Sequence, residues 1–68
     1  MVTDSATLRA KIKERGLKMT FIAQQIGVTL STLSRKISGR AGFTQKEIKI
    51  IAQILGLSDK ETCSIFLA

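Results

Sequence analysis

Leucine and isoleucine recur every three or four residues along most of the chain, and the sequence contains no proline. An α-helix turns once in about 3.6 residues, so this spacing gathers the apolar side chains of each segment on one helical face. Glycines then stand where four of the segments stop, at residues 16, 27, 39 and 56. The pattern predicts an all-α fold, a compact bundle of five helices.

The helix boundaries follow from capping chemistry. Thr44 and Glu47 have the spacing of a capping box, and Ser58 and Glu61 repeat it. Lys18 is a poor cap, because it offers no side-chain oxygen to the first free N–H groups of a helix. The expected helices span about residues 4–15 (capped by Asp4 or Ser5), 19–26, 30–38 (capped by Thr29), 45–55, and 59 to 65 or 66.

The chain is short and basic. Its 68 residues suffice for one domain, residues 1–68, and its net charge of +6 suits a polyanionic partner, although solubility alone would also explain it. A single cysteine and no histidine leave neither a disulfide nor a metal cluster, so we expect a cytoplasmic protein without cofactors. The N-terminus lacks an apolar signal core and no segment is long enough to span a membrane, so no membrane partner is expected.

Residues 19–38 have the organisation of a helix-turn-helix. Two short helices are joined through Gly27, which allows the left-handed backbone that reverses the chain. Ala23 is small where the two helices cross closely. Val28 and Leu33 are expected to fill the angle between them.

The segment LKMTFIAQQIGVTLSTLSRKISGR resembles the Cro/cI-type (XRE-like) helix-turn-helix family, and TQKEIKIIAQILGLS resembles that family's fourth helix and turn. The whole chain, including IFLA, resembles short phage-associated regulators. The resemblance implies a phage repressor-like domain that binds operator DNA in a bacterial host, at the nucleoid, and regulates transcription. Two departures stand out. Met19 replaces a polar, phosphate-contacting residue, and Lys36 replaces an apolar one, so the third helix is either slightly rotated or carries a lysine stem along apolar surface.

In such a module the third helix, about residues 30–38, enters the major groove while Leu33 and Ile37 face the core. The outward side chains expected to contact bases are Leu30, Ser31, Ser34 and Arg35. The guanidinium fork of Arg35 suits guanine, although a contact to phosphate alone stays open. The expected phosphate contacts are Lys18, Lys36, Arg40 and Lys46, for each of which plain solvation is the alternative.

An enzyme is not expected, because histidine is absent and three of the five acids lie in first turns of helices, where capping explains them. Cys63 lacks a histidine base and is expected to be buried filler.

The competing function is an antirepressor or another protein-binding module on the same fold. If Ile51 and Leu55 face the core, Ile50 and Ile54 point away from it. Together with an apolar tail they would form an interface for a homodimer or a repressor protein, unless the fifth helix and the tail cover them. The residues of this expected interface are Ile50, Ile54, Phe66 and Leu67.

Overall fold

The computed structural model describes residues 3–66, which form five α-helices and no strand. The helices are α1 (Ser5–Glu14), α2 (Met19–Ile26), α3 (Leu30–Ile37), α4 (Gln45–Leu55) and α5 (Asp59–Phe66). The all-α, five-helix prediction is confirmed, and the sequence placed each helix within a residue of its observed ends.

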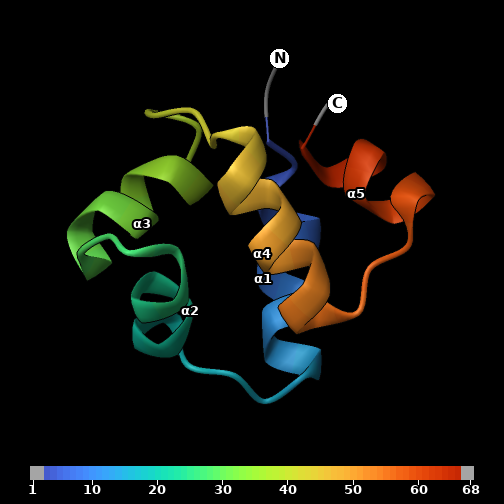
Figure 1. The fold of residues 1–68 in the computed structure, drawn as a ribbon, viewed down its shortest axis with the longest axis horizontal. Helices are drawn as coiled ribbons and strands as arrows, with labels where there is room; N and C mark the ends of the chain where they lie inside the picture. The colour runs from blue at the N-terminus through green and yellow to red at the C-terminus, as the bar shows by residue number, and fades with distance from the viewer. Residues whose placement is uncertain (1–2, 67–68) are drawn as a thin grey trace.

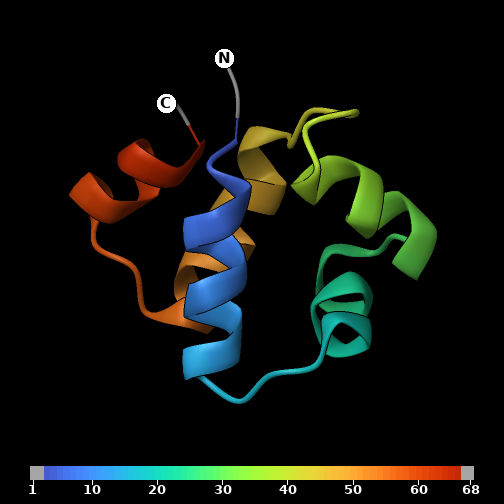
Figure 2. The ribbon, with the colours of Figure 1, turned by 180° about the vertical axis from the view of Figure 1, so that it is seen from behind.

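The helices surround one core (Figure 1). In that view α4 runs down the front, with α2 and α3 on one side of it and α5 on the other, and α1 comes to the front when the molecule is seen from behind (Figure 2). Helix α2 packs against α3 and α4, whereas α5 packs against α1 and α4. The Asp4 N–H donates to the Ile65 carbonyl over 2.7 Å, so the start of α1 is tied to the end of α5.

Every helix contributes two buried apolar side chains to this core. They are Leu8, Ile12, Ile22, Ala23, Leu33, Ile37, Ile51, Leu55, Ile65 and Phe66. A small domain has little apolar surface to bury, so its stability depends on this short set of side chains. The set includes Leu33 and Ile37 of α3, which orients that helix in the bundle.

The expected caps form. Asp4 accepts a hydrogen bond from the Thr7 N–H over 3.2 Å, and Thr29 accepts one from the Thr32 N–H over 3.2 Å. Both bonds of the capping box are present at Thr44. Lys18 makes no side-chain capping bond at the start of α2, as its residue type predicted.

The turn between α2 and α3 is built on Gly27, whose φ of +77° lies in the left-handed region. The next residue, Val28, donates its N–H to the carbonyl of Ala23 over 3.0 Å and packs against the core. Ala23 itself is buried. The chain therefore reverses directly and brings α3 across α2.

The structure corrects two expectations about the C-terminal part of the chain. Phe66 is only 4% exposed and meets the ring of Phe43 edge to face at 5.2 Å between centroids, so it belongs to the core and not to an interface. Cys63, expected to be buried, is exposed. Helix α5 turns its Ile65–Phe66 end inward, because that burial removes an aromatic ring from water. Leu67 lies outside the described residues.

The two isoleucines of α4 that were expected to point away from the core are also less exposed than predicted. Ile50 and Ile54 are half-buried, and neither counts among the exposed large apolar side chains of residues 3–66. They lie on the side of α4 that carries Glu47, which reaches a side chain of α3.

Candidate nucleic-acid interface

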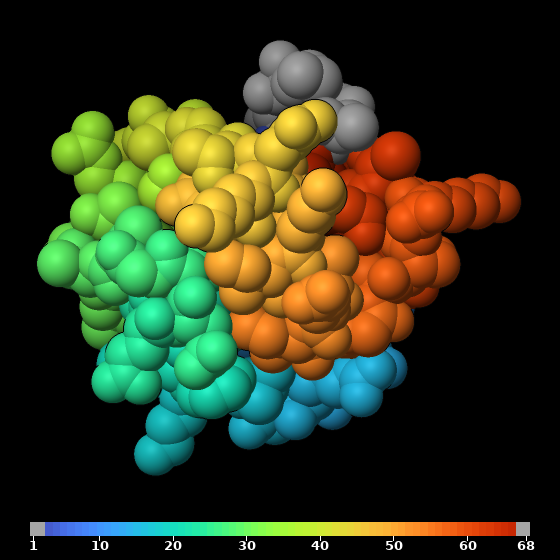
Figure 3. All heavy atoms as spheres, viewed as in Figure 1, coloured from blue at the N-terminus to red at the C-terminus, as the bar shows by residue number. Residues whose placement is uncertain are grey.

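Helix α3 has one buried face and one open face. Leu33 and Ile37 are 0% exposed, whereas the side chains predicted to contact bases all reach solvent. Those side chains are Leu30, Ser31, Ser34 and Arg35. Leu30 is 47% exposed, although Leu33 one turn further along the helix is buried. In Figure 3, α3 and the loop after it form one continuous surface with the start of α4, from green to yellow.

Both ends of α3 are held in place. Thr29 caps its first turn, and the Ser5 hydroxyl at the start of α1 donates to the carbonyl of Ile37, the last residue of the helix. Beyond the helix, the Arg40 and Ala41 N–H groups both donate to the Arg35 carbonyl, over 2.9 and 3.2 Å. The backbone that carries Arg40 is thus folded back onto the end of α3.

Charge is concentrated around this helix. No acidic residue occurs between Glu14 and Glu47, while the basic residues in that stretch are Arg15, Lys18, Arg35, Lys36, Arg40 and Lys46. Of the predicted contacts, Lys18, Arg35, Arg40 and Lys46 are exposed, and none of them belongs to the two ion pairs found within residues 3–66. The gap in acidic residues can be read directly from the sequence, and it indicates the basic face more specifically than the total charge does.

Lys36 behaves differently from the other basic residues. Its ammonium group lies 3.0 Å from a carboxylate oxygen of Glu47 and donates to the Gly42 carbonyl over 2.8 Å. It also stands 5.8 Å from the centre of the Phe43 ring, and both side chains of the ion pair are only 12% exposed. The lysine stem therefore runs along apolar surface to an internal partner. The phosphate contact expected from Lys36 has no support in this geometry.

The same environment shifts the ionisation of Glu47. Burial on its own would raise the pKa of this carboxyl group, but the opposing contacts are stronger. The Thr44 N–H donates to it over 2.9 Å, and Lys36 adds a hydrogen bond and a positive charge, so the pKa falls below its ordinary value of 4.5. Glu47 thus serves as a helix cap and as an ion-pair partner at once.

A lowered carboxyl pKa makes the stability of the protein depend on acid. Folding favours the ionised form of Glu47, so its contribution is complete above the ordinary pKa of 4.5 and is lost as pH falls through the lower, folded value. We expect the stability difference between wild type and Glu47→Gln to shrink as pH falls from 7 to 3. Urea unfolding at several pH values measures it. A stability difference that stays constant between pH 7 and pH 3 would contradict a lowered pKa of Glu47. In a Lys36→Met background, the contribution of Glu47 to stability should be lost at a higher pH, because the neighbouring positive charge is absent.

Two apolar residues of α2, Met19 and Phe21, lie outside its buried pair. Met19 is half-buried and packs against the core, so the position where the resemblance led us to expect a polar side chain is here part of the packing. Phe21 is 40% exposed and was not anticipated. A signal did exist in the sequence, because Phe21 lies off the helical face defined by Ile22, Ala23 and Ile26.

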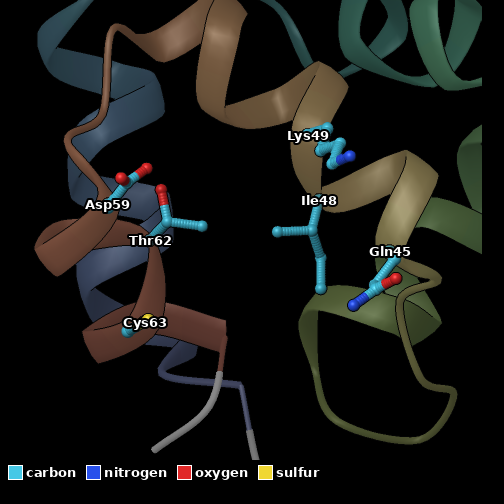
Figure 4. Close-up of a pocket in the computed structure, with 6 residues that line it drawn as sticks. All are labelled: Gln45, Ile48, Lys49, Asp59, Thr62 and Cys63. Atoms are coloured by element: carbon cyan, nitrogen blue, oxygen red, sulfur yellow. The ribbon is translucent and has the colours of Figure 1, made fainter.

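A groove lies between α4 and α5 (Figure 4). Ile48 of α4 and Thr62 of α5 point toward each other across it, and its volume is about 370 Å³. The other residues that line it are Gln45, Lys49, Asp59 and Cys63. No cluster of three or more metal-ligating side chains occurs in residues 3–66, and no helix in that range is long and apolar enough to be a membrane span.

The fold and this interface define a helix-turn-helix domain, with a capped helix that presents an open, basic-flanked face. Residues 8–61 match the family model described as helix-turn-helix, of the XRE type, and the chain belongs to that family of DNA-binding regulators. The family binds DNA and is not typically enzymatic. Neither the curated proteins nor the solved structures contain a match.

Proposed function

We propose that the protein is a sequence-specific transcriptional regulator of the phage repressor or Cro type, with α3 as its recognition helix in the major groove of operator DNA. The observation that carries the proposal is the division of α3 into a buried face, Leu33 and Ile37, and an exposed face that ends in Arg35. A helix of this kind is anchored by the core and leaves its outer side chains free for base edges.

The roles of the outer side chains follow from their chemistry. Arg35 donates both arms of its guanidinium to the O6 and N7 atoms of one guanine. Ser31 and Ser34 each supply one polar contact, and Leu30 packs on a thymine methyl group. These contacts select sequence.

The remaining basic side chains hold the DNA backbone. Arg40 and Lys46 lie on the loop after α3 and in the first turn of α4, where one phosphate strand would pass. Lys18 stands at the start of α2, whose free N–H groups add to the attraction for phosphate. These contacts position the protein on the duplex without selecting bases.

A single copy of a domain this small covers only a few base pairs. Two copies on a two-fold operator would double the contacts and raise specificity, as in other helix-turn-helix regulators. The protein-binding alternative rested on Ile50, Ile54, Phe66 and Leu67, of which Phe66 is buried and Ile50 and Ile54 are half-buried. The exposed, basic-flanked face of α3 favours DNA binding, which is the function that we propose.

The test is selection of duplexes by the wild-type protein from a random-sequence pool, followed by a salt series on the selected and an unselected duplex. We expect the pool to converge and the selected duplex to bind at least about a thousandfold more tightly. The logarithm of the binding constant should fall linearly with the logarithm of salt concentration, by about 0.9 for each phosphate neutralised. Mass in solution, with and without DNA, gives the number of copies bound.

Failure of the pool to converge, with equally weak binding to both duplexes, would reject operator binding. The basic face would then serve solubility, and a search for a protein partner would be the next step.

A further inference from the structure

The two ion pairs in the described part of the chain have the same arrangement. In each, the glutamate that completes a helix capping box also binds a lysine from a neighbouring helix at 3.0 Å. The pairs are Glu47 with Lys36, which joins α4 to α3, and Glu61 with Lys11, which joins α5 to α1. Only the first touches the proposed recognition helix.

The surroundings of the two pairs differ. Both side chains of Lys36–Glu47 are 12% exposed, whereas those of Lys11–Glu61 are 32% and 42% exposed. The Lys36 ammonium has a further internal acceptor in the Gly42 carbonyl. Water screens the charges of the exposed Lys11–Glu61 pair much more than those of the shielded Lys36–Glu47 pair. Only Lys36–Glu47 is therefore expected to hold its helices in a defined position.

We propose that Lys36 and Glu47 are positioning residues for base recognition. Through them α4 sets the orientation of the last turn of α3 and of the loop that carries Arg40, so that Arg35 and Arg40 reach the duplex together. This inference rests on the proposed function and adds a specificity-determining pair that does not itself touch DNA.

The connections run directly from the ion pair to the two arginines. Lys36 is the neighbour of Arg35 in α3, and its ammonium holds Gly42, two residues beyond Arg40. The Arg40 N–H is bonded to the Arg35 carbonyl in turn. On the α4 side of the ion pair, Glu47 accepts a hydrogen bond from the Thr44 N–H, which fixes the carboxylate at the start of that helix. Helix α3, the loop after it and helix α4 thus meet at one ion pair.

The alternative role for Lys36, a phosphate contact, conflicts with this arrangement. Moving the ammonium to a phosphate would break two hydrogen bonds and leave the Glu47 carboxylate shielded and unpaired, which is unfavourable. Glu47 also cancels the charge of Lys36 as seen by the DNA. The pair therefore contributes nothing to the salt dependence of binding.

The experiment compares two charge-neutral double variants, Lys36→Met with Glu47→Gln, and Lys11→Met with Glu61→Gln. Each keeps the net charge at +6, and glutamine still satisfies a capping box, so both helix starts are preserved. Affinity for the selected and the unselected duplex is measured over the same salt series, at a temperature where circular dichroism shows all proteins folded.

We expect the Lys36/Glu47 variant to lose preference for the selected duplex by about tenfold, the size of one weakened base contact. Its affinity for unselected DNA and its salt slope should equal those of wild type. The Lys11/Glu61 variant should match wild type in all three quantities, since a role confined to stability moves none of them in a folded protein.

Three outcomes would overturn the inference. If the wild-type pool does not converge, the proposed function fails and the inference falls with it. If the pool converges and the Lys36/Glu47 variant discriminates as well as the control, the pair does not position α3. If instead the charge-neutral Lys36/Glu47 variant lowers affinity for both duplexes alike and reduces the salt slope by about 0.9, Lys36 is a phosphate contact.

Discussion

Leu33→Ala is expected to lower the free energy of unfolding by about 2–5 kcal/mol, the usual range for a buried leucine cut to alanine. Leu33 is 0% exposed and belongs to the single core cluster of the described residues, so its truncation removes apolar contacts from that core. A domain of 68 residues has little stability in reserve, and a loss of this size would leave much of the protein unfolded. Urea unfolding followed by circular dichroism measures the change.

Leu30→Ala is the matched control, because it removes the same atoms from the same helix at a side chain that is 47% exposed. Its effect on stability should stay within about 0.5 kcal/mol. Similar losses for the two variants would mean that α3 does not present Leu33 to the core, and the assignment of its outer face would be wrong as well.

Arg35→Ala is expected to cost about 1–3 kcal/mol of discrimination between the selected duplex and one changed at a single base pair. The side chain is exposed and belongs to no ion pair within residues 3–66, so its removal should leave stability nearly unchanged. Competition binding against duplexes substituted one base pair at a time measures the discrimination.

Two further variants separate base reading from phosphate binding. Arg35→Lys keeps the charge but loses the planar fork, so a bidentate guanine contact predicts nearly the same loss of discrimination as alanine. Arg40→Ala should weaken binding to all sequences alike. If Arg35→Lys restores wild-type discrimination, or if Arg35→Ala and Arg40→Ala weaken all duplexes equally, Arg35 contacts phosphate only.

The sequence alone predicted the helices, their caps and the helix-turn-helix. Each of these depends on interactions that act within about one helical turn, such as the bond from the Glu47 N–H to the Thr44 hydroxyl three residues earlier. The burial of Leu33 and Ile37 followed as well, because helical periodicity assigns a face before any partner is known. The exposure of the outer side chains of α3 was predictable for the same reason, whereas their roles toward DNA came from the resemblance and remain predictions.

The tertiary structure decided how that face is held and which basic residues remain free. The partner of Lys36 lies 11 residues away, the Ser5 hydroxyl reaches a carbonyl 32 residues away, and Arg15 donates to the Leu55 carbonyl across 40 residues. The burial of Phe66 and the exposure of Cys63 likewise depend on how α5 lies against α1 and α4. Periodicity and capping are properties of one segment, whereas these contacts exist only once packing brings distant segments together.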